Sequence, residues 1–348
     1  MKITGILLSF ILAVVVSLSS LRAEEKSVPD NPQPFEVWLA DLKQEALEQG
    51  ISPGTLETAF TNVAPIPKII ELDRRQPEFT QTYAQYISRR VSPTRIAKGR
   101  EKISEFSGLL SPVAQSMGVQ ERFIAAIWGM ETNYGSYTGG YSVIAALTTL
   151  AYDMRRPTYF RKELLRALKI LDEGHISPED MKGSWAGAMG QGQFMPSSFY
   201  SYAYDFDQDG RKDIWVNESD VFASIANYLK RHGWREDQTW GREVTLPEDV
   251  DGLWEKVQQT GKIKSCRRAL KDHSKQLSLD EWKALGVKSK FGGDLPDVGE
   301  RPFKASLVMP AGKDGPAYLT YENFRSILRY NCSNFYALGV SLLADELR

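Results

Sequence analysis

The chain has 348 residues, a formal net charge of −1 and three histidines, with 42% hydrophobic and 25% charged residues. This composition is typical of a soluble globular protein with one large or two to three small domains. The near-neutral charge and the lack of a clustered Lys/Arg tract argue against a nucleic-acid partner. The scattered histidines argue against a zinc site or a histidine-based catalytic triad. No dinucleotide-binding or phosphate-loop motif follows a predicted strand, so we expect no organic cofactor.

The N-terminus has the pattern of an export signal. Lys2 precedes an apolar run over residues 6–16, and small and polar residues end at Ala23, which predicts a secretory signal peptide over residues 1–23. The apolar run is too short to favour a membrane span, and no cysteine near the cleavage point could accept a lipid. We expect a periplasmic protein with no transmembrane anchor in the mature chain; an uncleaved anchor is the alternative.

Helical patterns dominate the first part of the mature chain, and residues 24–110 predict an N-terminal helical region. Apolar residues recur at helical spacing from Phe35 to Ala46, before a stop at Gly50. Ser52 and Pro53 then supply an N-cap and a first-turn proline for a second helix. Further helices are predicted over residues 94–106 and 119–132, and residues 111–238 are expected to form a catalytic core.

Glu131 is the acidic residue that stands out in this core. It follows Trp128 by three residues and Ile124 by seven, so it shares their face of the predicted helix. Burial beside an indole disfavours the ionised form of a carboxyl group, which raises its pKa and allows it to donate a proton near neutral pH. The alternative is a glutamate at the helix end that points to solvent.

The composition of the sequence changes after residue 182. Residues 183–198, GSWAGAMGQGQFMPSS, combine glycines with small and amide side chains, which allows close approach of backbone to backbone or to a ligand.

Residues 239–316 contain only short segments of regular pattern and predict a small mixed or β-rich subdomain. The segments include a capping box at Ser278 and Glu281 and a β-like run from Phe303 to Met309. Residues 317–348 are expected to return to the body as C-terminal helices.

An EF-hand-like loop is predicted over residues 205–220. Four aspartates occupy loop positions one, three, five and nine, with glycine at position six, where an EF-hand loop turns sharply. Val216 stands at position twelve in place of the usual glutamate, so Asp220 or Glu218 must complete the shell, and we favour Asp220. The candidate ligands of a structural Ca²⁺ are Asp205, Asp207, Asp209, Arg211, Asp213 and Asp220. The alternative is a solvated acidic turn.

Cys266 and Cys332 are the two cysteines of the chain. In an oxidising compartment they can pair, and closing so long a loop contributes about 4 kcal/mol by chain-entropy estimates. Two separate buried thiols are an equal alternative, because the sequence does not reveal their separation.

Five motifs, in order along the chain, resemble the lytic murein transglycosylase B family. They are GMETNYG at 129–135, GAMGQGQFMPS at 187–197, the acidic loop before Ile214 and Trp215, ANY at 226–228 and RYN at 329–331. The resemblance covers residues 35–347. It implies a mainly α (α+β) protein: a lysozyme-like helical core with a small mixed subdomain and a calcium loop.

The resemblance also implies a site and a reaction. Glu131 matches the family's catalytic acid/base, and five residues match those that bind peptidoglycan glycan strands: Ser184, Gln193, Tyr228, Tyr330 and Asn331. The implied reaction cleaves the bond from N-acetylmuramic acid to N-acetylglucosamine and leaves a 1,6-anhydro end. Glycosidases normally use two carboxyl groups, and Glu131 alone has a motif, which fits assistance by the substrate's acetamido group. The rival hypothesis is a non-catalytic glycan-binding or scaffold protein.

Overall fold

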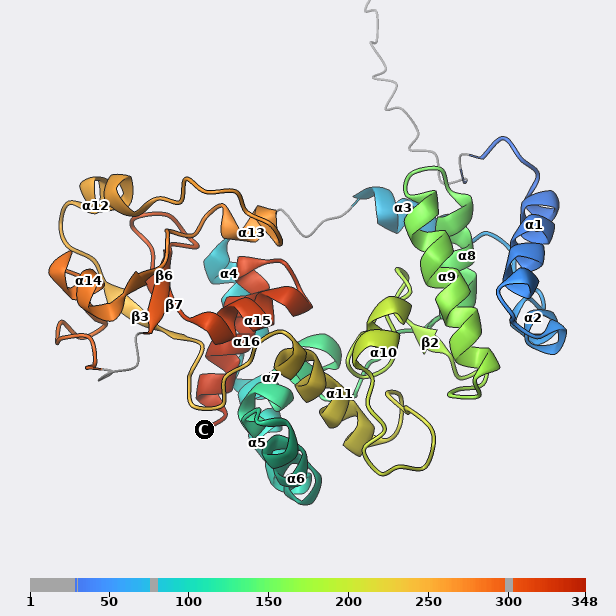
Figure 1. Ribbon diagram of the computed structural model, residues 1–348, viewed down its shortest axis with the longest axis horizontal. Helices are drawn as coiled ribbons and strands as arrows, with labels where there is room; N and C mark the ends of the chain where they lie inside the picture. Colours follow the sequence, from blue (N-terminus) through green and yellow to red (C-terminus); the bar gives the residue numbers. More distant parts are fainter. Residues whose placement is uncertain (1–28, 30, 76–80, 298–302) are drawn as a thin grey trace, which may run out of the picture.

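A computed structural model describes residue 29 and residues 31–75, 81–297 and 303–348. The signal peptide predicted over residues 1–23 lies outside these described residues. The described chain is mainly helical and carries a small antiparallel sheet, as the sequence predicts (Figure 1). No helix in the described ranges combines the length and the apolar character that a bilayer crossing needs.

The helices and strands up to residue 202 are α1 (Phe35–Glu48), α2 (Pro53–Ala59), α3 (Pro67–Arg75), α4 (Tyr83–Arg90), α5 (Pro93–Glu105), α6 (Ser107–Met117), α7 (Glu121–Thr132), β1 (Tyr141–Ser142), α8 (Val143–Tyr152), α9 (Pro157–Asp172), β2 (Lys182–Gly183) and α10 (Pro196–Tyr202). Those after it are α11 (Glu218–Arg231), β3 (Gly241–Thr245), α12 (Val250–Val257), α13 (Arg267–Leu270), β4 (Leu277–Ser278), α14 (Leu279–Ala284), β5 (Lys288–Ser289), β6 (Lys304–Val308), β7 (Ala317–Thr320), α15 (Glu322–Tyr330) and α16 (Asn334–Glu346).

Local sequence signals mark the start of two helices. The Ser52 side chain accepts a hydrogen bond from the backbone N–H of Thr55, and Pro53 begins α2. Ser278 and Glu281 form the predicted capping box of α14, in which each side chain accepts from the other residue's backbone N–H. The predictions at both positions are confirmed.

Two hydrophobic cores meet at the middle of the molecule. The first packs α7 against α6, α11 and α16 and buries Phe123, Ile127 and Trp128. The second joins α1 and α2 to α8, α9 and the glycine-rich segment that follows them. Tyr330, at the end of α15, packs against both cores. The candidate residue Tyr330 therefore lies where the two cores meet, and α7, which carries Glu131, belongs to the first of them.

The five-stranded sheet has the order β4-β6-β7-β3-β5, and every neighbouring pair is antiparallel. A third core lies between this sheet and α12 and α14, and it buries Trp282 and Leu307. The sheet body lies at one side of the helical body in Figure 1, next to α15 and α16. Its strands begin at Gly241, close to the predicted start of the subdomain.

Two predicted boundaries do not coincide with element ends. The boundary between residues 110 and 111 falls inside α6, which continues through Pro112. The segment from residue 317, which we assigned to the C-terminal helices, begins with β7, a strand paired on both sides. All four residues of β7 are buried, so this strand lacks the alternation that would reveal it in the sequence.

Cys266 and Cys332 form a disulfide with a Cα–Cα distance of 5.1 Å. Of the two alternatives left open by the sequence, the structure thus has the paired one. The bond connects the segment before α13 to the turn between α15 and α16, across a sequence separation of 66.

Candidate active site

Glu131 lies near the C-terminal end of α7, which contributes a nearly continuous buried surface from Phe123 to Met130. The Glu131 side chain is only partly exposed. Three consecutive residues after the helix adopt left-handed backbone conformations, with φ values of 52° at Asn133, 62° at Tyr134 and 73° at Gly135. Such conformations are uncommon outside glycine and cluster at functional sites, and here they end the helix directly after Thr132.

The Glu131 carboxyl group is held by Tyr336, whose hydroxyl donates a hydrogen bond of 2.5 Å to Oε1. Burial raises the pKa of Glu131 from 4.5 to about 7, and the Tyr336 hydrogen bond and the charge of Arg90 act in the opposite direction. A carboxyl group with this pKa is protonated in a large fraction of molecules at neutral pH, and it can therefore act as an acid and, after losing its proton, as a base.

Tyr336 was not among the residues singled out by the sequence. It lies in an amphipathic segment whose apolar residues predict a helix, and a tyrosine there is most simply a core side chain. It is 6% exposed, and its ring stacks on that of Tyr330 at 6.5 Å. Only the packing of α16 on α7 reveals that its hydroxyl faces Glu131.

We expect Tyr336→Phe to shift the pH dependence of activity. The variant removes the hydrogen bond that favours the ionised form of Glu131, so the pKa of Glu131 should rise above about 7. The alkaline limb of the pH–rate profile should then move up by roughly one pH unit. Tyr134→Phe is the matched control, because the Tyr134 hydroxyl donates to the carbonyl of Arg95 instead. An unchanged alkaline limb in Tyr336→Phe would contradict the assigned role.

Gln191 connects α7 to the loop that follows the acidic residues. Its side-chain oxygen accepts 2.7 Å from the indole N–H of Trp128, and its side-chain nitrogen donates 3.0 Å to the carbonyl of Trp215. Its backbone N–H donates to the carbonyl of Ile214. The residue is 6% exposed, so these bonds are shielded from water. Gln191 therefore holds the helix of Glu131 and the acidic loop in a fixed relation.

The glycine-rich segment folds back on itself beside α7. Ser184 and Ala188 are joined by a backbone hydrogen bond of 2.8 Å, and the Ser184 hydroxyl also accepts from the N–H of Ala188. A Cβ at Gly190 would lie 2.5 Å from the carbonyl oxygen of Ile214, so glycine is required for this close approach. The glycines thus serve backbone packing, one of the uses the sequence suggested.

Gln193 adopts a left-handed backbone conformation with φ 50°. Its side-chain nitrogen donates 2.9 Å to the carbonyl of Thr138 and 3.0 Å to that of Gly190, which fixes the amide beside the turn after α7. Both Ser184 and Gln193 are partly exposed.

Two of the three remaining candidates form an aromatic group with Phe194. The rings of Tyr228 and Tyr330 lie 4.6 Å apart. Their hydroxyls donate to backbone carbonyls, Tyr228 to Arg329 and Tyr330 to Gly192, each at 2.6 Å. Both hydroxyl protons are therefore already used, which leaves the rings and the hydroxyl oxygens, as acceptors, for contact with a ligand. Asn331 is exposed in the turn that follows α15.

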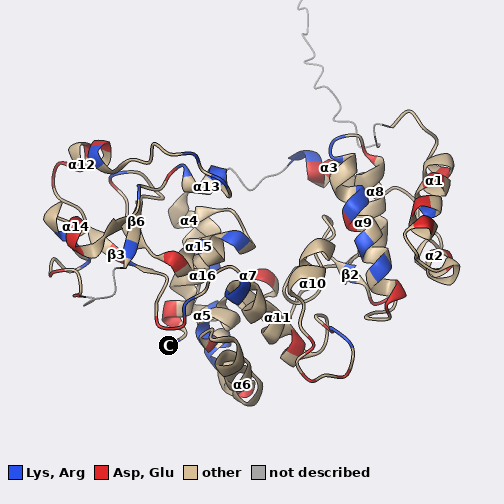
Figure 2. Cartoon of the chain, in the orientation of Figure 1, with Lys and Arg blue, Asp and Glu red and all other residues tan. Residues whose placement is uncertain are grey.

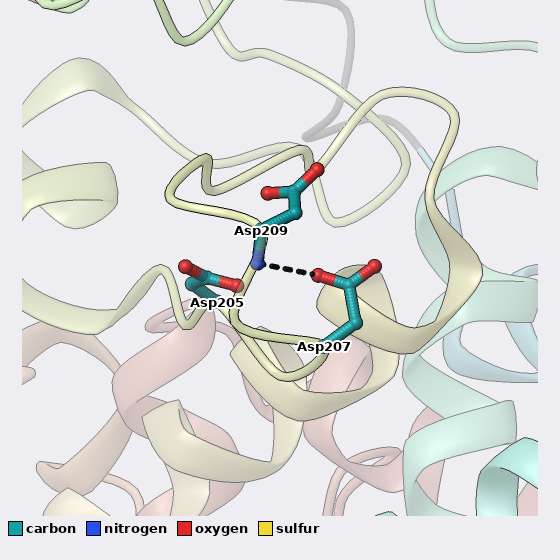
Figure 3. A group of neighbouring side chains, drawn as sticks. All are labelled: Asp205, Asp207 and Asp209. Atoms are coloured by element: carbon teal, nitrogen blue, oxygen red, sulfur yellow. Dashed lines mark hydrogen bonds between the residues drawn. The ribbon is translucent and has the colours of Figure 1, made fainter.

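Three carboxylates converge in the acidic loop. One oxygen each from Asp205, Asp207 and Asp209 lies within 4.8 Å of the others. Figure 3 shows the three side chains on this loop. The backbone N–H of Asp209 donates to Asp207, and that of Gly210 donates to Asp205 at 3.0 Å. Gly210 has φ 90°, as the sharp turn at position six requires. The Asp205 Oδ1 atom is buried and has no hydrogen-bond partner among the described residues.

The other predicted metal ligands lie outside this group of three. Both oxygens of Asp220 accept backbone hydrogen bonds of 2.8 Å, one from Phe206 and one from Asp213. Asp213 Oδ1 accepts from the N–H groups of Trp215 and Val216. Arg211 could contribute only its backbone carbonyl to a metal ion. Its guanidinium lies 3.7 Å from Asp213. Asp220, in the first turn of α11, acts here as a brace between the two ends of the loop.

The residues present fit a hard cation. Burial of a carboxylate oxygen without a hydrogen-bond donor is unfavourable in free energy. A cation would coordinate Asp205 Oδ1 and reduce the repulsion between the three aspartates. The loop is also connected to α7, since Asp213 holds the N–H of Trp215 and the carbonyl of Trp215 accepts from Gln191.

Comparison with known proteins identifies the family of the chain. The family profile of the Transglycosylase SLT domain matches residues 34–345. The chain is 30% identical over 266 residues to membrane-bound lytic murein transglycosylase B of Escherichia coli K12, covering 76% of this chain and 67% of that protein.

Solved structures are also similar. SltB3 from Pseudomonas aeruginosa in complex with NAG-anhNAM-pentapeptide matches with a TM-score of 0.83 and 43% identity, over 90% of this chain and 80% of that one. Escherichia coli Slt35 in complex with calcium matches with a TM-score of 0.72 and 26% identity, over 93% and 96% of the two chains. These neighbours confirm the predicted lysozyme-like fold. The chain therefore belongs to the Transglycosylase SLT domain family and is a lytic murein transglycosylase.

Proposed function

We propose that this protein cleaves the β-1,4 bond from N-acetylmuramic acid to N-acetylglucosamine in peptidoglycan and leaves a 1,6-anhydro end, with Glu131 as its single general acid and base. The observation that carries this proposal is the raised pKa of Glu131, about 7, in a setting fixed by Tyr336. Among the described residues, no second carboxylate shifts the pKa of Glu131. A substrate-assisted route, which needs no second carboxyl group from the protein, fits this environment.

The proposed reaction has two steps. Protonated Glu131 gives its proton to the glycosidic oxygen as the bond to the muramoyl C1 breaks, and the acetamido oxygen of the same sugar stabilises the positive charge at C1. Ionised Glu131 then takes the proton of the muramoyl 6-hydroxyl, whose oxygen attacks C1. Glu131 recovers its proton and no water is consumed.

The substrate would lie against the residues around Glu131. We propose that the rings of Tyr228 and Tyr330 pack against sugar rings, since their hydroxyl protons are already donated to backbone carbonyls. Ser184, Gln193 and Asn331 would supply hydrogen bonds to the glycan.

Mass spectrometry of peptidoglycan digests tests the proposed reaction. Products should end in 1,6-anhydro sugar; reducing ends at similar yield would indicate hydrolysis instead. If purified sacculi bind the protein without losing turbidity, the rival hypothesis of a non-catalytic glycan-binding or scaffold protein would be correct.

We further propose that the acidic loop binds a structural Ca²⁺ through Asp205, Asp207 and Asp209, supported by their convergence and by the buried, partnerless Asp205 Oδ1. A calcium complex is named for the similar Slt35 structure. In this proposal the ion supplies positive charge that holds the loop closed, and Asp213 and Asp220 brace the backbone around it.

Chelation is expected to lower the melting temperature. With free calcium at 100 times its dissociation constant, binding to the folded state alone adds about 2.7 kcal/mol, which chelator removes. Differential scanning calorimetry with and without EGTA measures this. Asp207→Asn should lower the melting temperature in calcium and respond less to EGTA than the wild type. If EGTA leaves the wild-type melt unchanged, the loop holds no ion.

We also propose that the protein acts in the periplasm. This rests on the signal-like sequence of residues 1–23 and on the extracytoplasmic location of the proposed substrate.

A further inference from the structure

Tyr137 is an exposed aromatic residue in the turn that follows α7. Its side chain is 72% exposed, against 46% for Tyr159 and 41% for Tyr204, and the rings of those two tyrosines each lie against a nearby phenylalanine. The Tyr137 ring has no aromatic or hydrogen-bond partner among the described residues and belongs to none of their three hydrophobic cores. Packing within the described chain therefore does not account for this ring.

The backbone of Tyr137 is fixed close to Glu131. Its N–H donates 3.1 Å to the carbonyl of Thr132, the residue directly after Glu131. The Thr132 side chain is buried, and its hydroxyl donates 3.0 Å to the carbonyl of Gln191. The position of Tyr137 therefore follows from the position of the end of α7.

The same turn contacts two of the candidate glycan-binding residues. The carbonyl of Thr138 accepts 2.9 Å from the side-chain nitrogen of Gln193. A Cβ at Gly139 would lie 2.7 Å from the backbone nitrogen of Ser184, so the chain here passes directly against the segment that carries Ser184. The turn of Tyr137 is therefore held against both Gln193 and Ser184.

The surroundings of Tyr137 in the sequence are uncharged. Residues 132–152 contain no Lys, Arg, Asp or Glu, whereas Figure 2 shows charged residues on helices at both ends of the molecule. The one cation that bonds to this turn, among the described residues, is Lys98 of α5, whose ammonium group donates to the Ser136 hydroxyl. An exposed aromatic ring in an uncharged segment suits the neutral face of a sugar ring better than an ionic ligand.

The exposure of Tyr137 also indicates which part of a glycan strand it can reach. Glu131 and Tyr330 are partly exposed, and Tyr228 is buried except for a small part of its surface. The two sugars at the cleaved bond must approach these residues closely. The Tyr137 ring stands in solvent at the rim of this group, where sugars further along the strand pass.

We propose that Tyr137 packs against a sugar ring outside the two sugars joined by the cleaved bond, and so makes the protein prefer longer glycan strands. This inference rests on the proposed function. A tyrosine provides a large contact area at a small loss of side-chain entropy, and turns on a rigid scaffold commonly carry residues that determine specificity. Tyr228 and Tyr330 come from α11 and α15, so Tyr137 adds an aromatic contact from a third part of the chain.

The test compares an octasaccharide of alternating N-acetylglucosamine and N-acetylmuramic acid with the disaccharide that contains only the cleaved bond. Tyr137→Ala should raise KM for the octasaccharide about fivefold and leave kcat unchanged, because the lost contact is made equally before and during the reaction. Its kcat/KM on the disaccharide should equal that of the wild type. Tyr137→Trp keeps an aromatic face and should restore the wild-type KM for the octasaccharide.

The matched control is Phe291→Ala, which removes a 92% exposed aromatic ring from the sheet body. It should behave as wild type on both substrates, and unchanged melting temperatures show that the variants fold. Equal losses of Tyr137→Ala on both substrates, no loss on the octasaccharide, or no rescue by Tyr137→Trp would each overturn the inference. A wild type that cuts neither substrate would instead refute the proposed function.

Binding without turnover provides a second readout. In the Glu131→Gln background, isothermal titration calorimetry with the octasaccharide should show about fivefold weaker binding when Tyr137→Ala is added. Adding Phe291→Ala to the same background should leave the dissociation constant unchanged. Equal affinity with and without the Tyr137 ring would contradict the proposed sugar contact, whatever reaction the protein catalyses.

Discussion

Glu131→Gln is expected to lower kcat on purified peptidoglycan by at least about 10³-fold, because one side chain is assigned both proton transfers and each such transfer contributes about 10²–10⁴-fold. Glutamine has nearly the same size as glutamate, and its carbonyl oxygen can still accept the Tyr336 hydrogen bond. Sacculus binding should therefore be retained. Release of anhydro-muropeptides, measured by mass spectrometry, is the direct assay.

The same variant should be more stable than the wild type at neutral and alkaline pH. The folded-state pKa of Glu131, about 7, lies above the reference value of 4.5, so the wild type loses relative stability as the pH rises from about 4.5 to 7. Below that window both side chains are neutral and the difference disappears. The full pKa shift corresponds to at most ~3 kcal/mol in the free energy of unfolding, and the partial exposure of Glu131 lowers this value.

Urea denaturation at pH 4 and pH 8 measures this difference. Glu101→Gln, at an exposed position on α5, is the control and should track the wild type at both pH values. Substantial residual turnover in Glu131→Gln would remove Glu131 from the mechanism. A stability difference that does not change with pH would show that its pKa is not raised.

Loss of the disulfide should be the largest change in stability. Cys266→Ser/Cys332→Ser opens a loop with a sequence separation of 66, and the chain-entropy model assigns about 4 kcal/mol to such a closure. For a domain of this size the melting temperature should fall by roughly 5–10 °C. The chain segment before α13 would also lose its covalent attachment to the turn after α15.

Calorimetry with and without a reducing agent checks the disulfide prediction. Reduction should destabilise the wild type and leave the double-serine variant unchanged, which separates the effect of the bond from other effects of the reductant. If the wild type melts at the same temperature when reduced, the bond contributes nothing to stability in solution.

Features that follow from local spacing could be predicted from the sequence. Glu131 was found because an acid interrupts an apolar helical face, and the three aspartates because EF-hand ligands recur at fixed intervals in one loop. The helix over residues 121–132 and the capping box of α14 follow from periodicity and capping, which act within one or two turns.

Residues whose role depends on tertiary packing could not be found in this way. Tyr336 meets Glu131 from a position 205 residues away, and Gln191 meets Trp128 from 63 residues away. Both look like ordinary residues within their own segments. The use of Asp220 as a backbone brace depends on how α11 packs on the loop, and β7 has no alternating pattern because both of its faces are buried.

The position of Glu131 within α7 has an electrostatic consequence of its own. Glu131 is the next-to-last residue of the helix, at the end where the aligned peptide dipoles place partial negative charge. A negative charge is unfavourable there by about 0.3–1 kcal/mol. The backbone N–H groups of Asn133 and Tyr134 bond to the last helical carbonyls and not to the carboxyl group. The helix dipole and burial therefore both favour the protonated form of Glu131. Part of its raised pKa is set by the backbone and should persist when neighbouring side chains are exchanged.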